Sequence, residues 1–229
     1  SRNTLYMGVI CFDSEPDKLM GNTMQRDAAL GAGDRFQWTF DPYLDERSGY
    51  FFEVNSSGAM GDALLGTADQ GNNSAARAWD GIWYAKVDRS GIGWTIEIEI
   101  PFRTLNFNPS APAWGLNIQR TVKRKNEESL WTGWRRNEGL RRMSNAGLLE
   151  GISDVSQGIG LNVQPYATGN YKDFSGRNLG SSYKGDGGID FIYNITPQLK
   201  GNFTINTDFA ETEVDQRRVN LTRFPLFFP

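Results

Sequence analysis

The strongest constraint on the fold of this chain is the alternation of apolar and polar residues with a period of two. In RFQWTF, Arg35 to Phe40, three aromatic residues alternate with polar ones, and GWTIEIEI, Gly93 to Ile100, repeats the pattern with Trp and Ile. Alternation of this kind places successive side chains on opposite faces of a strand and makes one face apolar. The 3.6-residue period of an amphipathic helix is almost absent. The sequence therefore predicts an all-β protein whose sheets each bury a face.

Several such runs follow one another, separated by turns rich in Gly, Asp, Asn and Ser. This arrangement predicts an antiparallel β-sandwich. Trp38, Trp94 and Trp114 stand on apolar strand faces, so we expect them to pack in its core. Trp79 and Trp83, in WDGIWYAKV, fit either core packing or an exposed position.

The first alternating run predicts a hairpin. We expect residues 36–41 and 50–55 to form adjacent antiparallel strands, in a register that puts the aromatics of both on one buried face. Residues 42–49 then form the connecting loop, with a proline at its start and a glycine at its end. Asp41, Asp45 and Glu46 supply hard oxygen ligands of the kind that calcium takes. A calcium site and a plain hairpin turn are both open.

The character of the chain changes near residue 153. We expect a sandwich over residues 1–152, followed over residues 153–229 by the first amphipathic strands of a second β domain or a partial barrel. Strands of about ten residues with one polar face are typical of transmembrane barrels, and they fit a soluble meander equally well. Three or so strands cannot close a barrel, so we interpret the chain as a fragment of a longer precursor.

Composition excludes several function classes. The chain has no histidine and one cysteine, Cys11. It therefore has no Ser-His-Asp or Cys-His catalytic group, no zinc site of His and Cys, and no internal disulfide. The net charge of −3 gives no global attraction to nucleic acid, which we do not expect as a partner. Between Arg120 and Arg142 basic residues cluster, which fits an anionic ligand or, more simply, a solvated loop.

The motifs LYMGVICFDSEPDK, GDRFQWTFDP, GYFFEVNSSG, GWTIEIEIPFRTL and WGLNIQR occur in this order over residues 5–122. In this order they resemble a family 9 carbohydrate-binding module. The resemblance implies a β-sandwich that typically carries calcium and grips the ends of sugars between aromatic side chains. In sugar-binding members one of two sandwiching tryptophans precedes the strand that matches DRFQWTF. The corresponding stretch here, MQRDAALGAG, contains none.

The remainder, from RKNEESLWTGWRRN to DFAETEVDQRRVNLTRFPLFFP, resembles an uncharacterised bacterial family. In that family such a module precedes an outer-membrane β-barrel. The resemblance implies a secreted protein of the cell envelope, at the outer membrane or in the periplasm of a Gram-negative-type bacterium. The outer membrane is then a partner through the C-terminal strands.

Together these features favour a non-catalytic module that binds carbohydrate. The residues expected to contact a glycan are Trp131, Trp134, Glu53, Asn55 and Arg120. Glu53 and Asn55 point away from the aromatic face of their strand, and the family places polar sugar contacts near FEVN. The two tryptophans stand among charged and small residues, where they fit stacking or packing against the second domain.

Three alternatives remain open. A hydrolase would use carboxylates, of which Glu97 and Glu99 share one strand face. A purely structural domain would plug or cap the barrel and bind nothing small. A haem-binding sandwich would need methionine or lysine as a ligand, because the chain lacks histidine.

Overall fold

A computed structural model describes residues 3–66, 79–133, 135, 139–155, 161–173, 181–196 and 199–206. The chain divides into two compact units, Ser1–Gly158 and Ile159–Pro229, and each is described by itself. Among the described residues, no helix is both long and apolar enough to span a membrane. Regular structure is almost entirely antiparallel strand, and the helices are single 3₁₀ turns, so the predicted all-β class is confirmed.

The described part of the first unit holds nine strands: β1 (Thr4–Phe12), β2 (Arg35–Asp41), β3 (Gly49–Asn55), β4 (Met60–Leu65), β5 (Tyr84–Ser90), β6 (Gly93–Pro101), β7 (Ala113–Val122), β8 (Glu127–Leu130) and β9 (Gly147–Glu150). Its 3₁₀ turns include η1 (Pro16–Lys18), η2 (Leu30–Ala32), η4 (Phe102–Thr104), η5 (Lys123–Lys125) and η6 (Met143–Asn145). The second unit holds β10 (Leu161–Asp173), β11 (Ser181–Thr196) and β12 (Leu199–Ile205).

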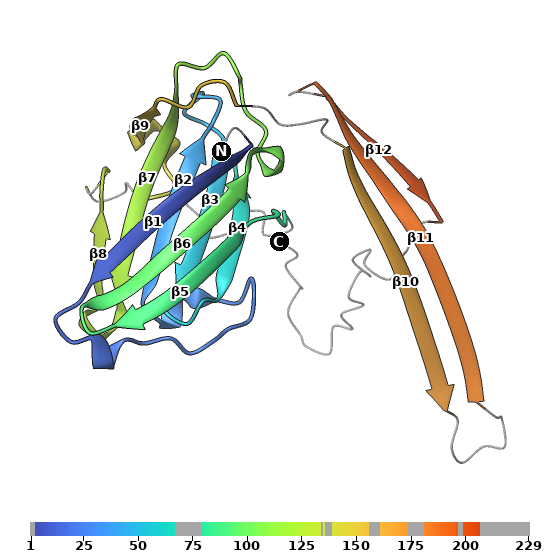
Figure 1. Cartoon of the computed structure of the whole chain (residues 1–229), viewed down its shortest axis with the longest axis horizontal. Helices are drawn as coiled ribbons and strands as arrows, with labels where there is room; N and C mark the ends of the chain where they lie inside the picture. Colours follow the sequence, from blue (N-terminus) through green and yellow to red (C-terminus); the bar gives the residue numbers. More distant parts are fainter. Residues whose placement is uncertain are drawn as a thin grey trace, which may run out of the picture. The chain divides into compact units, whose positions relative to one another are not determined.

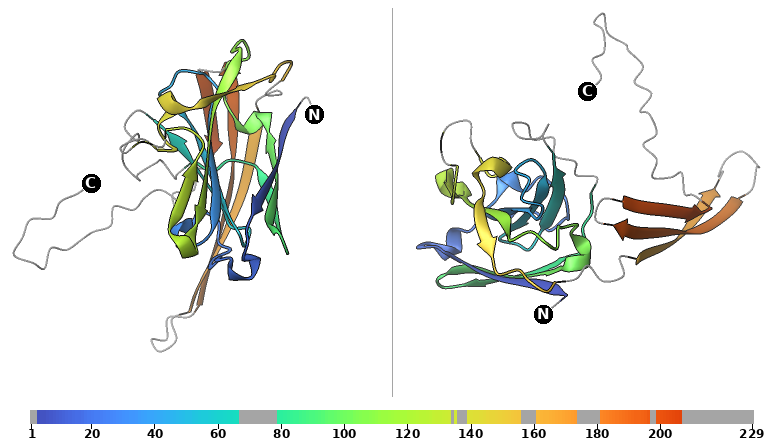
Figure 2. Two further views of the ribbon diagram at one scale, coloured as in Figure 1. Left: turned by 90° about the vertical axis from the view of Figure 1, so that its left-hand side faces the viewer. Right: turned by 90° about the horizontal axis from the view of Figure 1, so that it is seen from above.

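The strands of the first unit form two layers. A small sheet has the order β1-β6-β5, and a large sheet has the order β4-β3-β2-β7-β8, with β9 also paired to β7. Figure 1 shows the small sheet lying across the large one, and Figure 2 shows the two layers from other sides. This is the predicted antiparallel β-sandwich.

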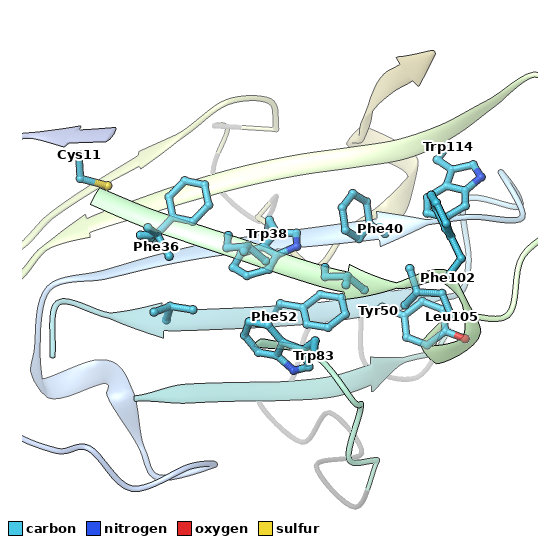
Figure 3. Packing of buried hydrophobic residues seen from close by; sticks show 14 of the residues in the cluster. Cys11, Phe36, Trp38, Phe40, Tyr50, Phe52, Trp83, Phe102, Leu105 and Trp114 are labelled. Atoms are coloured by element: carbon cyan, nitrogen blue, oxygen red, sulfur yellow. The ribbon is translucent and has the colours of Figure 1, made fainter. Parts of the chain in front are cut away.

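The core fills the space between the two sheets. The alternation of β6 buries Trp94, Ile96, Ile98 and Ile100, all at most 2 % exposed, against the aromatics of the large sheet. Figure 3 shows how those aromatics lie: Phe36, Trp38 and Phe40 follow one strand, with Phe52, Trp83 and Trp114 beside them. Each large side chain buried in this way contributes about 1.5–3 kcal/mol. Trp38, Trp94 and Trp114 are core residues, as predicted, and Trp83 joins them at 2 % exposed.

The predicted register of β2 and β3 is confirmed. Trp38 lies opposite Phe52, with Phe36 opposite Val54 and Phe40 opposite Tyr50. The rings of Trp38 and Phe52 stack at 5.3 Å between centroids. A slip by one residue would turn this aromatic row away from the small sheet, so the core fixes the pairing.

The other face of the large sheet is also partly covered. A second apolar cluster there contains Phe51, Ala63, Leu65, Leu140 and Met143. The segment around η6 supplies the last two, and the hydroxyl of Thr39 on β2 donates a hydrogen bond to the carbonyl of Leu140 at 3.3 Å. Large-sheet strands therefore bury side chains on both faces, which explains why nearly every residue of β2 and β3 is buried.

The second unit is a meander in which β11 lies between β10 and β12. Its pairing places Val163 opposite Phe191 and Phe191 opposite Phe203. Alternation thus collects apolar residues on one face: Leu161, Val163, Pro165, Ala167, Tyr171, Tyr183, Ile189, Phe191, Tyr193, Phe203 and Ile205. The opposite face carries Gln164, Thr168, Asn170, Lys184, Asp186, Asp190, Asn202 and Thr204, with Tyr166 and Ile192 as its apolar exceptions.

Candidate functional site

The outer face of the large sheet, turned away from the small sheet, carries a row of polar side chains. Gln37 on β2 lies opposite Glu53 on β3 and opposite Gln119 on β7. One step along the strands, Arg35 lies opposite Thr121. We call these five residues the polar face. They face outward because their neighbours in each strand, such as Phe36 and Trp38, face the core.

Glu53 is the charged centre of the polar face. Its side chain is 1 % exposed, and its Oε2 lies 3.1 Å from Nη1 of Arg35 and accepts a hydrogen bond of 3.2 Å from Nε2 of Gln37. A buried carboxylate is tolerated only with such partners. Gly61 on β4 lies opposite Glu53, and a Cβ there would approach Glu53 Cγ to 3.1 Å. Glycine at this position therefore leaves the space that the glutamate fills.

Gln37 presents an acceptor that the described residues leave unused. Its residue is 4 % exposed, and within the described part of the chain its Oε1 atom has no hydrogen-bond partner. A buried amide oxygen without a partner carries a desolvation cost of about 1–3 kcal/mol. A ligand hydroxyl that donates to this atom would remove that cost.

Asn55 serves the turn after β3. Its Oδ1 accepts the backbone N–H groups of Ser57 and Ala59 at 3.0 and 2.8 Å, and its Nδ2 donates to the carbonyl of Thr23 at 2.8 Å. The residue is 1 % exposed. Asn55 therefore holds the β3–β4 connection and the segment before η2 together.

Arg120 lies on the opposite face from Glu53. It is paired with Phe36, a core-facing residue, whereas its neighbour Gln119 is paired with Gln37. Its Nη1 donates to the carbonyl of Phe12 at 2.6 Å, and its Nη2 lies 3.6 Å from Asp13. The structure thus does not bring Arg120 and Glu53 to one site.

Trp131 directly follows β8 and is 53 % exposed. Its backbone N–H donates to the carbonyl of Ile118 at 2.9 Å. The ring lies over Gly147, where an added Cβ would come within 2.6 Å of it. Trp131 therefore presents an accessible ring at the β8–β9 edge of the large sheet. Trp134, its predicted companion, lies outside the described residues.

The carboxylates of the β2–β3 loop hold the loop itself. Asp41 is 1 % exposed and accepts the backbone N–H groups of Tyr43, Asp45 and Glu46 at 3.2, 3.3 and 2.7 Å. Asp45 accepts those of Arg47 and Ser48, each at 2.8 Å. In this loop Leu44 and Glu46 adopt positive φ angles of 53° and 60°, respectively. These contacts form the turn that the hairpin alternative predicts.

The surroundings shift the pKa values of the two aspartates of the loop in opposite directions. Burial raises the pKa of Asp41, against the opposing effect of its three N–H partners. For Asp45 burial acts in the same direction, but hydrogen bonds from the Ser48 and Arg47 N–H groups outweigh it, so its pKa is lowered. Among the described residues, no three His, Cys, Asp or Glu side chains are grouped to hold a metal ion. Calcium on Asp41, Asp45 and Glu46 stays a prediction.

A further buried carboxylate, Asp62 on β4, lies at the edge of the core. Its Oδ2 accepts hydrogen bonds from Trp83 Nε1 at 2.7 Å and Arg26 Nη2 at 2.6 Å, and its Oδ1 accepts the Gly81 N–H at 3.2 Å. Burial raises the pKa of Asp62. Each carboxylate oxygen of Asp62 has a hydrogen-bond donor within the protein, so we assign Asp62 a structural role.

Sequence reasoning missed Gln37, although the signal was present. The predicted register of the hairpin already puts Gln37 and Glu53 on the same outer face, and the structure places them opposite each other. The same arithmetic separates Arg120 from Glu53, because Arg120 has the parity of Trp114, Leu116 and Ile118, which face the core.

Comparisons with known proteins give a limited picture. No protein-family model and no curated protein match the chain. Similar solved structures include two of a family 9 carbohydrate-binding module from Caldicellulosiruptor kristjanssonii, one in complex with cellotriose and one with glucose. Their TM-scores are 0.46 and 0.41 and their identities 14 % and 13 %; each covers 65 % of this chain, and 69 % and 71 % of its own. What either protein binds is a property of that protein.

Proposed function

We propose that the first unit is a non-catalytic carbohydrate-binding module whose ligand contacts the polar face. The observation that carries this proposal is the amide oxygen of Gln37, which is buried on the outer face of the sheet without a partner among the described residues. A sugar hydroxyl both donates and accepts. It would donate to Gln37 Oε1 and accept from the amide of Gln119, which is in the same row.

The neighbouring ion pair supports this role. Arg35 holds Glu53 in place at 3.1 Å, so that the row keeps its geometry before a ligand arrives. Preorganised polar groups lose little entropy on binding. The exposed ring of Trp131 lies over Gly147, which pairs with the core-facing residue Leu116, so it would be a separate stacking surface for a sugar at the sheet edge and not a part of the polar face.

The burial of the Glu53 carboxylate and its pairing with Arg35 favour binding over hydrolysis. A glycosidase needs two carboxyl groups that flank the scissile bond and exchange protons. Glu53, the carboxylate in the centre of the polar face, is 1 % exposed and paired with Arg35. Glu97 and Glu99 lie on the small sheet, in the other layer.

Titration calorimetry on the full chain with a panel of soluble neutral and anionic oligosaccharides tests the proposal. We expect at least one ligand to bind the wild type, and Gln37→Ala to lower its affinity about tenfold. Glu127→Gln, an exposed change on β8, serves as the control and should bind as the wild type does. Silence across the whole panel would reject the proposal and leave the structural plug or cap as the better interpretation.

We also propose that the second unit contacts the outer membrane of a bacterial cell envelope. The supporting observation is its two-faced meander, apolar on one side and polar on the other. Tyr171 and Tyr183 lie in contact at one end of the apolar face, at 4.8 Å between ring centroids, and Tyr193 lies towards the other. Lipid-facing sheets have such an apolar band with aromatic residues at its borders.

Flotation of the full chain with phosphatidylcholine vesicles tests this second proposal. Phe203→Asp places a charge on the apolar face and should abolish flotation, while the adjacent Thr204→Asp places it on the polar face and should not. Equal behaviour of both variants, or no flotation of the wild type, would contradict it. Cell fractionation then tests whether the protein resides at the outer membrane or in the periplasm.

A further inference from the structure

The outer face of the small sheet carries two exposed tyrosines in one register row. Tyr6 on β1 and Tyr84 on β5 both lie opposite Glu99 on the central strand β6. They are 61 % and 60 % exposed, whereas their core-facing neighbours Leu5 and Ala85 pack inward. Because adjacent strands are about 4.8 Å apart, the two tyrosines are separated by about 10 Å.

The next row continues the surface with polar groups. Glu97 on β6 lies opposite Gly8 on β1 and opposite Lys86 on β5. An added Cβ at Gly8 would meet nothing within 4 Å, so the surface beside Tyr6 is open. One aromatic row and one polar row therefore lie side by side across three strands, and beyond them Ile10 and Phe12 on β1 are 55 % and 65 % exposed.

We propose that this face is a second carbohydrate-binding surface, on which one linear polysaccharide chain lies across the strands. The rings of Tyr6 and Tyr84 would stack on the apolar faces of two sugar units of that chain. Glu99, between them, and Glu97, in the next row, would accept hydrogen bonds from its hydroxyl groups.

The carboxylates decide between this ligand and an apolar protein partner. A protein that covered Tyr6 and Tyr84 would also cover Glu99, and burying an unpaired carboxylate is costly. Sugar hydroxyls offer that carboxylate donors and leave its surroundings partly hydrated. Glu99 separates Tyr6 from Tyr84, and the exposed apolar residues Ile10 and Phe12 lie on β1 beyond the Glu97 row, so the two rings do not form a continuous apolar patch of the kind usual at the centre of a protein interface.

This surface is independent of the polar face of the large sheet. The polar face is nearly buried, with Gln37 and Glu53 only 4 % and 1 % exposed. The outer face of the small sheet, with Tyr6 and Tyr84 61 % and 60 % exposed, is accessible to an extended chain or to the surface of an insoluble polymer. The two sites can therefore be tested with different probes and different variants.

The experiment is depletion of the full chain from solution by microcrystalline cellulose and by chitin particles. We expect the wild type to bind at least one of the two, and Tyr6→Ala/Tyr84→Ala to reduce the partition coefficient at least tenfold. Tyr6→Phe/Tyr84→Phe keeps both rings and should bind as the wild type does. Glu127→Gln, an exposed change on β8, should not alter this partition, and the calorimetry with soluble oligosaccharides tests the polar face separately.

A matched control removes two exposed tyrosines elsewhere. Tyr171→Ala/Tyr183→Ala acts on the second unit and should leave particle binding unchanged. The melting temperature of each variant establishes that it is folded, and since Tyr6 and Tyr84 lie outside the core, we expect it to change little. A wild type that binds neither polymer, or an alanine pair that binds like the wild type, overturns the proposal. So does an alanine pair that loses self-association instead, which would make the face a protein contact.

Discussion

Arg124 and Asp13 form a bidentate ion pair between the two sheets of the sandwich. Nη1 of Arg124 donates to Oδ2 of Asp13 at 2.7 Å, and Nη2 donates to Oδ1 at 2.5 Å. Asp13 follows β1 of the small sheet and Arg124 follows β7 of the large sheet, so the pair joins the two layers at one end. Arg120 adds a hydrogen bond to the carbonyl of Phe12 at 2.6 Å. The side chains of Arg124 and Asp13 are only 13 % and 2 % exposed. Salt therefore screens the attraction between them less than it screens an exposed ion pair.

The first prediction concerns acid stability. The hydrogen bond from Arg124, the largest effect, lowers the pKa of Asp13 from 3.8 to about 2. A depressed carboxyl pKa stabilises the fold above the unfolded value, and this contribution is lost as the pH falls from 3.8 towards 2. We expect Asp13→Asn to lower the melting temperature at pH 6 and to converge with the wild type near pH 2. An exposed change, Asp88→Asn, is the control. A wild-type advantage that is constant from pH 6 to pH 2 would contradict the prediction.

The second prediction concerns the β2–β3 loop. Asp41→Ala removes the acceptor of three backbone N–H groups, and we expect the free energy of unfolding to fall by about 1–3 kcal/mol. Urea denaturation in EDTA measures this loss. The prediction fails if Asp41→Ala unfolds at the wild-type urea concentration.

A third prediction separates the turn from the calcium site. If calcium binds this loop, adding it in place of EDTA raises the melting temperature of the wild type. Glu46→Gln should leave the melting temperature in EDTA unchanged, because no carboxylate hydrogen bond of the turn is lost, and should reduce the calcium increment. A wild type without any increment identifies the loop as a hairpin turn alone.

The fourth prediction concerns the buried carboxylate of Asp62. Trp83→Phe removes the N–H that donates to Asp62 at 2.7 Å, and we expect it to lower the free energy of unfolding by about 1–3 kcal/mol beyond the loss of ring volume. Trp94→Phe is the control for volume, because the Nε1 atom of Trp94 has no partner among the described residues. Combination of each change with Asp62→Asn should reveal coupling for Trp83 and none for Trp94. Equal coupling for both would count against the bond.

The fifth prediction concerns Cys11, the single cysteine of the chain. Burial is the main cause that raises the pKa of its thiol to about 11, and the residue is 3 % exposed. Because the thiolate is the reactive form, a disulfide reagent at pH 8 should react with Cys11 only as the protein unfolds. Absorbance of the released thiol, followed with and without urea, checks this. Immediate reaction of the native protein would show the core to be open at this point.

Local pattern was sufficient to predict the hairpin and its core. The alternation of β2 and β3 determines which side chains share a face, and burial of the aromatic face then determines the register. The same pattern contained the Glu53–Gln37 pair, because a register that pairs Trp38 with Phe52 necessarily pairs their chain neighbours Gln37 and Glu53.

Contacts between distant segments were beyond local pattern. Asp13 and Arg124 are 111 positions apart, and nothing in either segment specifies the other. Leu140 and Met143 cover Phe51 on the outer face, yet they come from an irregular segment without strand or helix periodicity. For Asn55, the strand face and the family resemblance indicated a sugar contact, and the structure uses the side chain to hold the turn that follows directly after it.

The distribution of indole rings gives this protein a built-in optical signal. Trp38, Trp83, Trp94 and Trp114 lie in the apolar core, whereas Trp131 is the exposed tryptophan of the described residues. Core indoles emit at shorter wavelengths than those in contact with water. In a Trp79→Phe/Trp134→Phe variant, selective quenching of the long-wavelength emission by iodide should therefore report on the β8–β9 edge, while the wavelength of the core emission reports on the packing between the sheets. Occupation of that edge by a sugar and loosening of the core would thus be distinguishable in one unlabelled sample.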